Sequence, residues 1–445
     1  MSDSGGRTRL DIYKGLTLKT NAADFGRRAF IQATVEKGSG SSEVNLDGEN
    51  HMELPGGNLF TASGEGAAIR VNGEGNAEQH LAGKVYAFKK AVVDINLDTA
   101  GSQAYLWTNT YRGTANEGTV NMTVKIGATW KAMGERPGSV SVLDVADGGV
   151  VDLTEFAENY PDQYHLVPSL EITELKGDGG IFRMETNIIK GQGQYVHIHD
   201  KSSGNHLVDV VDKSGAPGVD PYKPVKLFGT ENGDTDPSAY TATFDALHPV
   251  ELGPYEYLLG NADTVRESGL TQDFTDTDST SWYLYAAGKK GKPKPTPSAE
   301  AGQILASGGY LQGLVENQSL RQRLGDIRHF GLMDEGYTPW AKLVRASFSN
   351  GGDDLPVADT DITGTQFGLD RPVHSRTWKD GTEATVYAGF YGSYMTNKST
   401  AGPSRVKGHY YGIGAYMSQD MGSDYFDLVA RYGHNKADID SRTLG

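Results

Sequence analysis

Few residues of this sequence have the types and spacing that catalysis requires. The segment DSGG, from Asp3 to Gly6, places a serine where a nucleophile could lie. A nucleophilic serine needs a histidine and an acidic residue that a folded scaffold holds beside it. We expect no folded segment before Asp3 to supply them. We therefore interpret DSGG as a flexible polar end.

A second group with possible chemistry is VHIHD. His197 and His199 alternate along a predicted strand, so they share a face, and Asp200 or His206 could join them at a metal. A metal site needs three or four converging ligands, and the spacing here is not diagnostic. We expect the intervening apolar residues to face the core and the histidines to be solvated.

Other sequence signatures of enzymes and of cofactor binding are missing from the sequence. The glycine-rich residues 64–78 lack the P-loop spacing that binds phosphate. The sequence has 0 cysteines, which excludes disulfides and Cys-zinc sites. We therefore expect no catalytic residue, no cofactor and no metal, and predict that the protein is not an enzyme.

The composition limits the classes of partner. The formal net charge is -16, which argues against a nucleic-acid binder because such proteins present a basic face. Glycine makes up 58 of the 445 residues, about 13%, and there are 23 tyrosines. This composition favours turns and strands. No run of about 18 apolar residues indicates a transmembrane helix, and the N-terminus lacks the apolar core of a signal peptide.

Up to about residue 287 the elements are short alternating strands separated by Gly, Asn and Asp. KAVVDINLD places Val93, Ile95 and Leu97 on one side, and TVNMTVKIG repeats the pattern. Alternation with period 2 predicts strands with one buried face. A β-sandwich, a propeller and a parallel β-helix all fit, because periodicity does not distinguish them.

The composition changes after this series. AAGKKGKPKPTPSAEAG, residues 286–302, alternates lysine with proline, which predicts an extended linker without a hydrogen-bonded ladder. A helix follows over about 300–329, because apolar residues recur there at three- and four-residue spacing. Arg321, Arg323 and Arg328 lie in its C-terminal half, where cations suit the helix dipole.

Longer strands follow the predicted helix. We expect five, over about 337–349, 361–373, 382–397, 404–419 and 423–438. In YFDLVARY, apolar Phe426, Leu428 and Tyr432 share a face opposite Asp427 and Arg431. The pattern fits a membrane barrel with an apolar outer face and a polar lumen. It fits equally a soluble antiparallel sheet with one buried face.

Several motifs, in order, resemble bacterial autotransporters of the pertactin type (type V secretion). GDGGIFRMETNI, GQGQYVHIHDKSSGNHLVDVVD, LGPYEYLL and SWYLYA resemble the final rungs and cap of a pertactin-like passenger. LRQRLGDIR resembles the helix that enters the barrel. PWAKLV, TGTQFGLD, YAGFYGSY, YYGIGAYMS and DYFDLVARYGHN resemble its opening strands. The resemblance covers about residue 171 to the C-terminus, and the earlier residues match only in being β-helix-like.

This resemblance implies an all-β fold: a right-handed parallel β-helix, a linker, one α-helix and antiparallel strands of an incomplete outer-membrane barrel. The implied domains are β-helix rungs (1–170), a passenger cap or autochaperone region (171–287), a Lys/Pro linker (288–300), a pore-threading helix (301–330) and about five barrel strands (331–445). Because the family has about twelve strands, we expect the sequence to be a fragment that lacks its signal peptide.

The resemblance also implies structural or translocation roles for eight residues. They are Trp282, Tyr283 and Tyr285 at the passenger cap and Leu320, Arg323, Gly325, Asp326 and Arg328 on the helix. Some relatives are cut at an Asn-Asn pair before the matching leucine. Gln318 and Ser319 stand there instead, so we do not expect cleavage by asparagine.

The function implied is translocation of a β-helical passenger and its anchoring at the bacterial cell surface, with an adhesive or structural passenger. The expected partners are outer-membrane lipid, the barrel-assembly machinery and a host or cell-surface ligand, with no nucleic acid. Two alternatives remain: a β-helical enzyme that cleaves polysaccharide or peptide, and a soluble β-rich binding protein.

Overall fold

The computed structural model describes most of the chain, in two compact units, Met1–Lys294 and Pro295–Gly445. The described residues are 6–19, 29–36, 40–132, 137–155, 165–214, 223–230, 237–252, 255–269, 274–289, 292–330, 336–352, 355–379, 381, 383–402, 404–421 and 424–440. The unit boundary falls inside the expected linker. Within the first unit, β-sheet pairing continues across residue 170.

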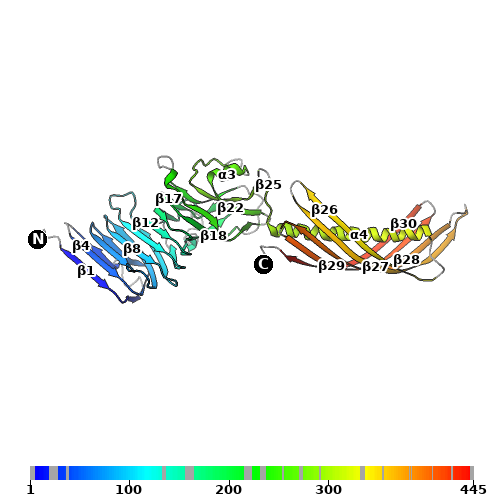
Figure 1. The fold of residues 1–445 in the computed structure, drawn as a ribbon, viewed down its shortest axis with the longest axis horizontal. Coiled ribbons are helices and arrows are strands. Elements are labelled where there is room, and N and C mark those ends of the chain that lie inside the picture. The colour runs from blue at the N-terminus through cyan, green and yellow to red at the C-terminus, as the bar shows by residue number, and fades with distance from the viewer. Residues whose placement is uncertain are drawn as a thin grey trace. The chain divides into compact units, whose positions relative to one another are not determined.

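The first unit is a parallel β-helix, as predicted (Figure 1). Its strands alternate between two sheets as the chain winds from rung to rung, and neighbouring rungs pair in parallel. The first sheet contains β1 (Arg7–Ile12), β4 (Ser41–Leu46), β6 (Ala67–Val71), β8 (Val92–Leu97), β10 (Thr119–Val124), β12 (Gly138–Val145), β14 (Leu170–Lys176), β17 (Val196–Ser202) and β19 (Val225–Thr230).

The second sheet covers the other side of the same core. It contains β2 (Thr17–Lys19), β5 (Asn50–Ser63), β7 (Gln79–Phe88), β9 (Gln103–Asn109), β11 (Thr129–Ala132), β13 (Val150–Asp152), β15 (Ile181–Asn187), β18 (Asn205–Asp212) and β20 (Thr243–Ala246). Two short strands pair at its side: β3 (Ala29–Thr34) with β5 and β16 (Gln192–Gly193) with β15.

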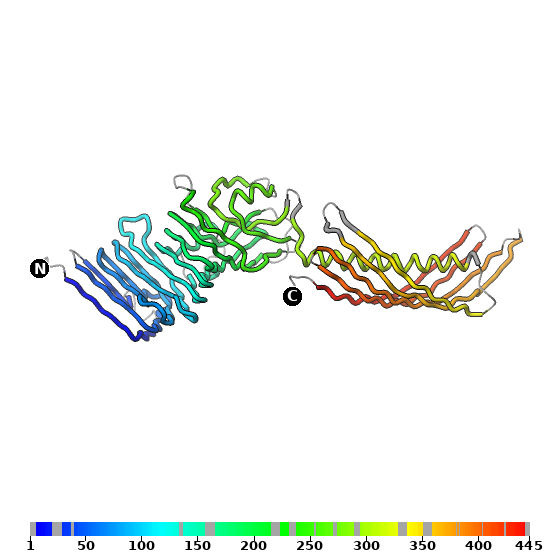
Figure 2. The backbone as a smooth tube through the Cα atoms, in the orientation of Figure 1, coloured from blue at the N-terminus to red at the C-terminus, as the bar shows by residue number. Residues whose placement is uncertain are grey.

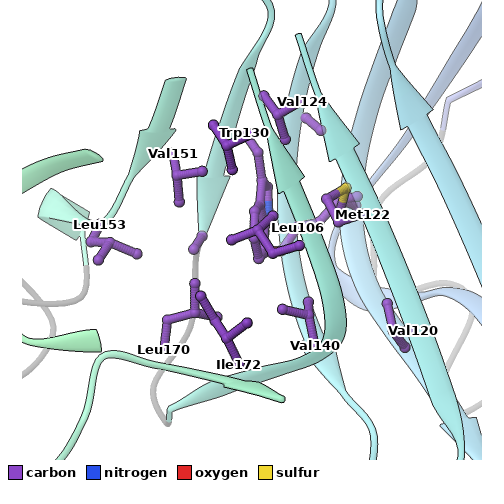
Figure 3. Packing of buried hydrophobic residues seen from close by; sticks show 14 of the residues in the cluster. Leu106, Val120, Met122, Val124, Trp130, Val140, Val151, Leu153, Leu170 and Ile172 are labelled. Atoms are coloured by element: carbon purple, nitrogen blue, oxygen red, sulfur yellow. The ribbon is translucent and has the colours of Figure 1, made fainter. Parts of the chain in front are cut away.

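Register aligns the inward side chains of successive rungs into columns. In the first sheet, Val71 pairs with Ile95 and Ile95 with Met122. In the second, Ala104 pairs with Trp130, whose indole Nε1 donates to the Leu106 carbonyl at 3.0 Å. Figure 3 shows Met122, Trp130 and Leu106 among the apolar side chains that pack together in this core. Each rung therefore buries its apolar face on the rung before it.

The solenoid ends on antiparallel strands. β23 (Trp282–Ala286) pairs with β19, the last parallel strand of the first sheet, and then with β22 (Tyr255–Asn261), which pairs with β21 (Val250–Leu252). The short helix α3 (Ala262–Ser268) follows β22, and a 3-10 turn, η1 (Pro237–Ala239), lies upstream. The edge of β19 is thereby covered, which removes a template for pairing with other chains.

The Lys/Pro linker differs from its prediction. β24 (Gly288–Lys289) and β25 (Lys292–Pro293) form a two-residue antiparallel ladder, and Lys294 N donates to the Ala287 carbonyl at 2.6 Å. The expectation that no ladder forms in this segment is therefore wrong. Pro293 is tolerated because it lies at the end of a two-residue strand, where no further ladder bond is needed.

The second unit is a long helix against one antiparallel sheet (Figure 2). The helix is α4 (Pro297–Phe330). The sheet is ordered β26 (Thr338–Gly352), β27 (Leu355–Thr377), β28 (Glu383–Ala401), β29 (Ser404–Met421) and β30 (Asp424–Asp440). The predicted helix and all five predicted strands are present, with ends that differ by a few residues.

Helix α4 has a defined start and one buried stripe. Pro297 occupies the first helical turn, where its missing N–H costs nothing, and the Thr296 hydroxyl accepts from Ala299 N at 3.1 Å. The buried stripe recurs at helical spacing: Ala301, Ile304, Gly308, Leu311, Gln312, Val315, Glu316, Ser319, Leu320, Leu324 and Ile327. In the described part of the chain, no helix is both long and apolar enough to cross a membrane.

Candidate functional site: buried ion pairs between the helix and the strands

Two buried carboxylates lie where α4 meets the sheet of the second unit. Asp370 on β27 is 0% exposed and Glu316 on α4 is 1% exposed. A buried carboxylate is costly unless it is paired and hydrogen-bonded. Both are paired by side chains from other elements, so the pairs fix the helix on the sheet.

The first pair joins the helix to β27. Arg323 donates to both carboxylate oxygens of Asp370, from Nε at 3.0 Å and from an Nη at 2.8 Å. Tyr416 on β29 donates its hydroxyl to the same carboxylate at 2.5 Å. The guanidinium also lies 5.8 Å from the ring centre of Trp340. A bidentate contact of this kind fixes the relative orientation of the two side chains and also stabilises the pair.

The second pair lies about two helical turns earlier. Glu316 accepts from the hydroxyls of Ser393 and Tyr410, each at 2.7 Å, and from the Arg431 guanidinium at 3.0 Å. Arg431 also donates to the Asn317 side-chain oxygen at 3.1 Å. Residues of β28, β29 and β30 therefore hold one helical carboxylate.

Apolar side chains surround these polar contacts. Leu320, Leu324 and Ile327 pack on Trp340, Tyr391 and Tyr416, and an earlier helical group packs on Ile362 and Met395. Three rings lie over strand glycines, where an added Cβ would come within 2.5 Å of the ring: Tyr416 over Gly389, Tyr391 over Gly414 and Tyr410 over Gly433. Glycine at these positions makes room for the rings that contact the carboxylates and the helix.

The five predicted helix residues occupy different environments. Leu320 is in the core and Arg323 forms the Asp370 pair, whereas Asp326 forms a half-exposed ion pair with Lys342 at 3.3 Å. A Cβ on Gly325 would meet nothing within 4 Å. Arg328 belongs to α4, but its side chain lies outside the described residues.

The three predicted cap residues divide between two faces of β23. Trp282 faces the β-helix core, 5.5 Å from Phe244, and closes the last rung. Tyr283 and Tyr285 instead pack with Ala262 and Val265 of α3. Burial raises the pKa of Tyr283, and its hydrogen bond to the Asp276 carboxylate raises it further. These two tyrosines therefore fix α3 on the outside of the cap.

The candidate catalytic and metal-binding groups do not assemble a site within the described residues. Asp3 and Ser4 lie outside those residues. His197 and His199 have ring centres 4.4 Å apart, but in the described part of the chain no three acidic or histidine side chains converge. The expectation that the histidines are solvated is wrong for His199, which is buried where a register shift interrupts the alternation and where the Tyr240 hydroxyl donates to its carbonyl.

Alternation in the sequence placed Arg431 on the polar face of its strand, but sequence reasoning missed Glu316 and the tyrosines. Glu316 was detectable, because it lies four residues before Leu320 on the helix's apolar stripe. Tyr410 and Tyr416 were not, because their neighbours Tyr411 and Met417 suit either face.

The chain is similar to two protein families. A family described as Autotransporter beta-domain matches residues 339–445, and a family described as Pertactin matches residues 140–284. The first match begins at β26 and the second ends inside β23. Each match therefore lies within one of the two structural units.

Similar curated proteins carry consistent names. The chain is 26% identical over 286 residues to "Probable autotransporter YcgV" of Escherichia coli. The aligned region covers 57% of this chain and 26% of that protein. It is 27% identical over 268 residues to "Serine protease SepA autotransporter" of Shigella flexneri (60% and 17%). It is 23% identical over 333 residues to "BrkA autotransporter" of Bordetella pertussis (71% and 29%).

The chain thus spans less than a third of the length of each of these relatives. Along the chain, a parallel β-helix with an antiparallel end comes first, a helix follows, and long antiparallel strands come last. The two family matches occur in the same order, Pertactin on the β-helix and Autotransporter beta-domain on the strands. The chain belongs to the pertactin-type autotransporters, with passenger residues in its first unit and translocator-domain residues in its second.

Proposed function

We propose that the second unit contributes to a barrel wall in the bacterial outer membrane and that this barrel translocates and anchors the β-helical passenger at the cell surface. The single observation that carries the proposal is the opposite character of the two faces of the sheet β26–β30. One face buries charged and polar side chains against α4, and the other exposes large apolar ones.

The exposed face is unusual for a protein surrounded by water. Phe390 is 71% exposed, Ile413 67% and Tyr432 72%, and Phe367, Leu369, Phe426 and Leu428 lie on the same side. Monomers in water rarely expose a continuous apolar area of this kind. A lipid environment removes the cost, because hydrocarbon chains contact such side chains without ordering water.

The helix face supports the same assignment. Asp370 and Arg323 would be costly in lipid, but they are compatible with a polar lumen. Arg431 and Asp427 face the helix side of β30, beside helix residues Asn317 and Arg321. We therefore assign α4 to the lumen, where it connects the strands to the passenger.

For the passenger we propose a non-enzymatic adhesive or structural role. Support comes from the solenoid itself, whose rungs stack on a continuous core and present a long outward surface. Its partners would be a host or cell-surface ligand, with outer-membrane lipid and the barrel-assembly machinery as partners of the second unit and no nucleic acid. An enzymatic passenger is the second candidate, because some similar proteins are named serine proteases.

Folding on the outer side of the membrane would begin at the capped end. The antiparallel strands β21, β22 and β23 cover β19, so this end can form a closed edge before the other rungs arrive. Each further rung then pairs with the one before it and buries its apolar face.

Single-cysteine labelling tests the display of the passenger, since the sequence contains 0 cysteines. Lys131→Cys lies on the outward side of β11, and Tyr391→Cys lies buried beneath α4. A membrane-impermeant maleimide added to intact cells should label the first and not the second. Labelling of Lys131→Cys only after cell lysis would contradict surface display.

A further inference from the structure

Four aromatic side chains form a stripe on the outward face of the second sheet of the β-helix. Tyr86 and Phe88 alternate with buried residues along β7. Trp107 does the same on β9, and Tyr111 follows the end of that strand. Tyr111 is 38% exposed, and the other three side chains are half-buried. These four residues, here called the aromatic stripe, are therefore accessible from solvent on the side of the passenger.

The aromatic stripe consists of two similar ring pairs. The ring centres of Tyr86 and Trp107 lie 5.4 Å apart, and the two planes meet at 71°. Phe88 and Tyr111 repeat this edge-to-face arrangement at 5.8 Å and 65°. Tyr86 also lies 6.2 Å from Tyr111, so the two pairs are continuous. Each pair joins a ring from β7 to a ring from β9 or from the loop that follows it.

The two ring pairs are separated by about one turn of a polyproline II helix. Trp107 lies opposite Lys84 on β7, so its pair with Tyr86 is centred near residue 85. The second pair lies near residue 88, three residues further along the strand. At roughly 3.3 Å per strand residue, this separation is about 10 Å. A polyproline II helix repeats every three residues at about 3.1 Å each, which is about 9 Å.

The loop after β9 holds Tyr111 in a conformation that tyrosine rarely adopts. Its φ is +54°, and the adjoining Lys89 and Lys90 of the facing turn have φ of +57° and +65°. The loop is tied to that turn because Lys89 N donates to the Asn116 carbonyl at 2.8 Å and Lys90 N to the Glu117 carbonyl at 2.7 Å. Such strain is concentrated at binding and active sites. The backbone alone would favour glycine or asparagine at Tyr111, so we attribute the tyrosine to its ring.

Hydrogen-bond donors flank the first ring pair. Lys84 lies beside Trp107, and Asn109 lies beside Tyr86. The Asn109 side-chain oxygen accepts from Tyr111 N at 2.7 Å, so its amide N–H groups serve as donors to a ligand. A polyproline II backbone has no internal hydrogen bonds, and its carbonyls therefore need donors from a partner. Lys84 and Asn109 are placed to supply them.

The aromatic stripe is small for a folded partner. A fully covered aromatic side chain buries about 150–250 Å². None of the four is more than 38% exposed, so together they offer at most about 400 Å². A stable interface between folded proteins covers about 800 Å² on each partner. The stripe therefore suits a short extended segment better than a folded domain.

We propose that the aromatic stripe binds a proline-rich segment of another protein in the polyproline II conformation. Successive turns of the segment pack on the two ring pairs, and its carbonyls accept hydrogen bonds from Lys84 and Asn109. Proline-rich segments dock on aromatic side chains in this way because they are already ordered before they bind and lose little entropy.

This inference rests on the proposed surface role of the passenger and names a ligand class for it. Binding by the purified protein does not depend on display, so a failure to bind and a failure to be displayed are separate results. Display is measured by the cysteine labelling described above. Binding is measured in solution with the complete 445-residue chain in detergent micelles.

The experiment is calorimetric titration with three probes: dodecaproline, a glycine-serine peptide of the same length, and cellotetraose as a neutral saccharide. Dodecaproline should bind, and the other two should bind about tenfold more weakly or not at all. Trp107→Ala should weaken the binding of dodecaproline about tenfold or more, since buried tryptophans dominate such interfaces. Tyr111→Asn should also weaken it, although asparagine suits the left-handed backbone and should keep or increase the stability of the loop.

Tyr13→Ala is the matched control, because Tyr13 is 63% exposed on the β-helix and lies outside the aromatic stripe. Its affinity for dodecaproline should equal that of the unaltered chain, and circular dichroism should show the same fold for all variants. Four results would each overturn the proposal: no binding of dodecaproline, equal binding of the glycine-serine peptide, tighter binding of cellotetraose, or unchanged affinity in both Trp107→Ala and Tyr111→Asn.

Discussion

Replacing Arg323 by methionine should destabilise the second unit more than any surface change in the same helix. The substitution leaves the Asp370 carboxylate 0% exposed, with the Tyr416 hydroxyl as its remaining donor among the contacts described above. Removing one partner of a buried ion pair typically costs about 3–5 kcal/mol, because the other charge stays buried and uncompensated. We expect Arg323→Met to lie in this range.

The reverse substitution should cost less. Asp370→Leu leaves a guanidinium whose side chain is 15% exposed and therefore in contact with water. We expect a loss of about 1–3 kcal/mol, the usual cost of an unsatisfied polar group. The double variant leaves no buried charge at this position, so its stability should return to within about 1–2 kcal/mol of the unaltered protein.

The assay is urea unfolding of the protein in detergent micelles, followed by the shift between folded and heat-denatured bands on a gel. Arg321→Met is the matched control, because Arg321 is exposed on the same helix. Single-variant losses that simply add in the double variant would refute the reasoning. So would an Arg323→Met loss no larger than that of Arg321→Met.

Three further predictions concern other parts of the chain. Leu428→Arg should reduce barrel assembly, with a cost of about 2–4 kcal/mol if the side chain meets the middle of the membrane. Val429→Arg, at a position on the helix side of β30, should reduce assembly less than Leu428→Arg does. Equal heat-modifiability of the two variants would contradict the assignment of the two faces. Trp282→Ala should make the β-helix more sensitive to protease because it opens the last rung, whereas the exposed Tyr105→Ala should not. Burial lowers the pKa of His206 below its ordinary 6.5, so the unfolded chain takes up a proton first as the pH falls. The first unit should therefore lose stability between pH 6.5 and that lower pKa. His206→Phe should flatten this part of the profile in denaturant titrations, and an unchanged slope would contradict it.

Strand positions were predictable because burial on one face imposes period 2 on the sequence. The same period arises in a β-sandwich and in a β-helix. It therefore does not show whether the strand of Val93 pairs in parallel with the strand of Val120, as it does here, or in an antiparallel hairpin. The parallel solenoid followed from the resemblance, which rested on motif order.

Side chains alternate between the two faces of β23, so the sequence alone indicates which cap residues share a face. In β23, Trp282 and Leu284 face the core, so Tyr283 and Tyr285 must face the other side. Their partner α3 was also signalled, since Asn261 caps its start and Gly269 ends it in the left-handed conformation. A helix of seven residues is too short for the periodicity that found α4.

The buried ion pairs were only partly predictable. Asp370 alternates with the apolar Phe367 and Leu369 of β27, which is consistent with its place on the helix side, but alternation does not identify Arg323 as its partner, because Arg321 and Arg328 lie on the same helix. The choice depends on how α4 is rotated and shifted along the sheet. That registration is a tertiary property set by the packing of Leu320 and Leu324 on Trp340 and Tyr416.

Spin-label accessibility tests the central claim most directly: that the sheet β26–β30 separates lipid from a polar lumen that holds α4. A nitroxide at Phe390→Cys reports the apolar face, and one at Asn317→Cys reports the exposed side of α4. In a reconstituted bilayer, the first should be relaxed mainly by dissolved oxygen and the second mainly by a water-soluble nickel chelate. Preferential relaxation of both labels by the nickel chelate would contradict the barrel assignment.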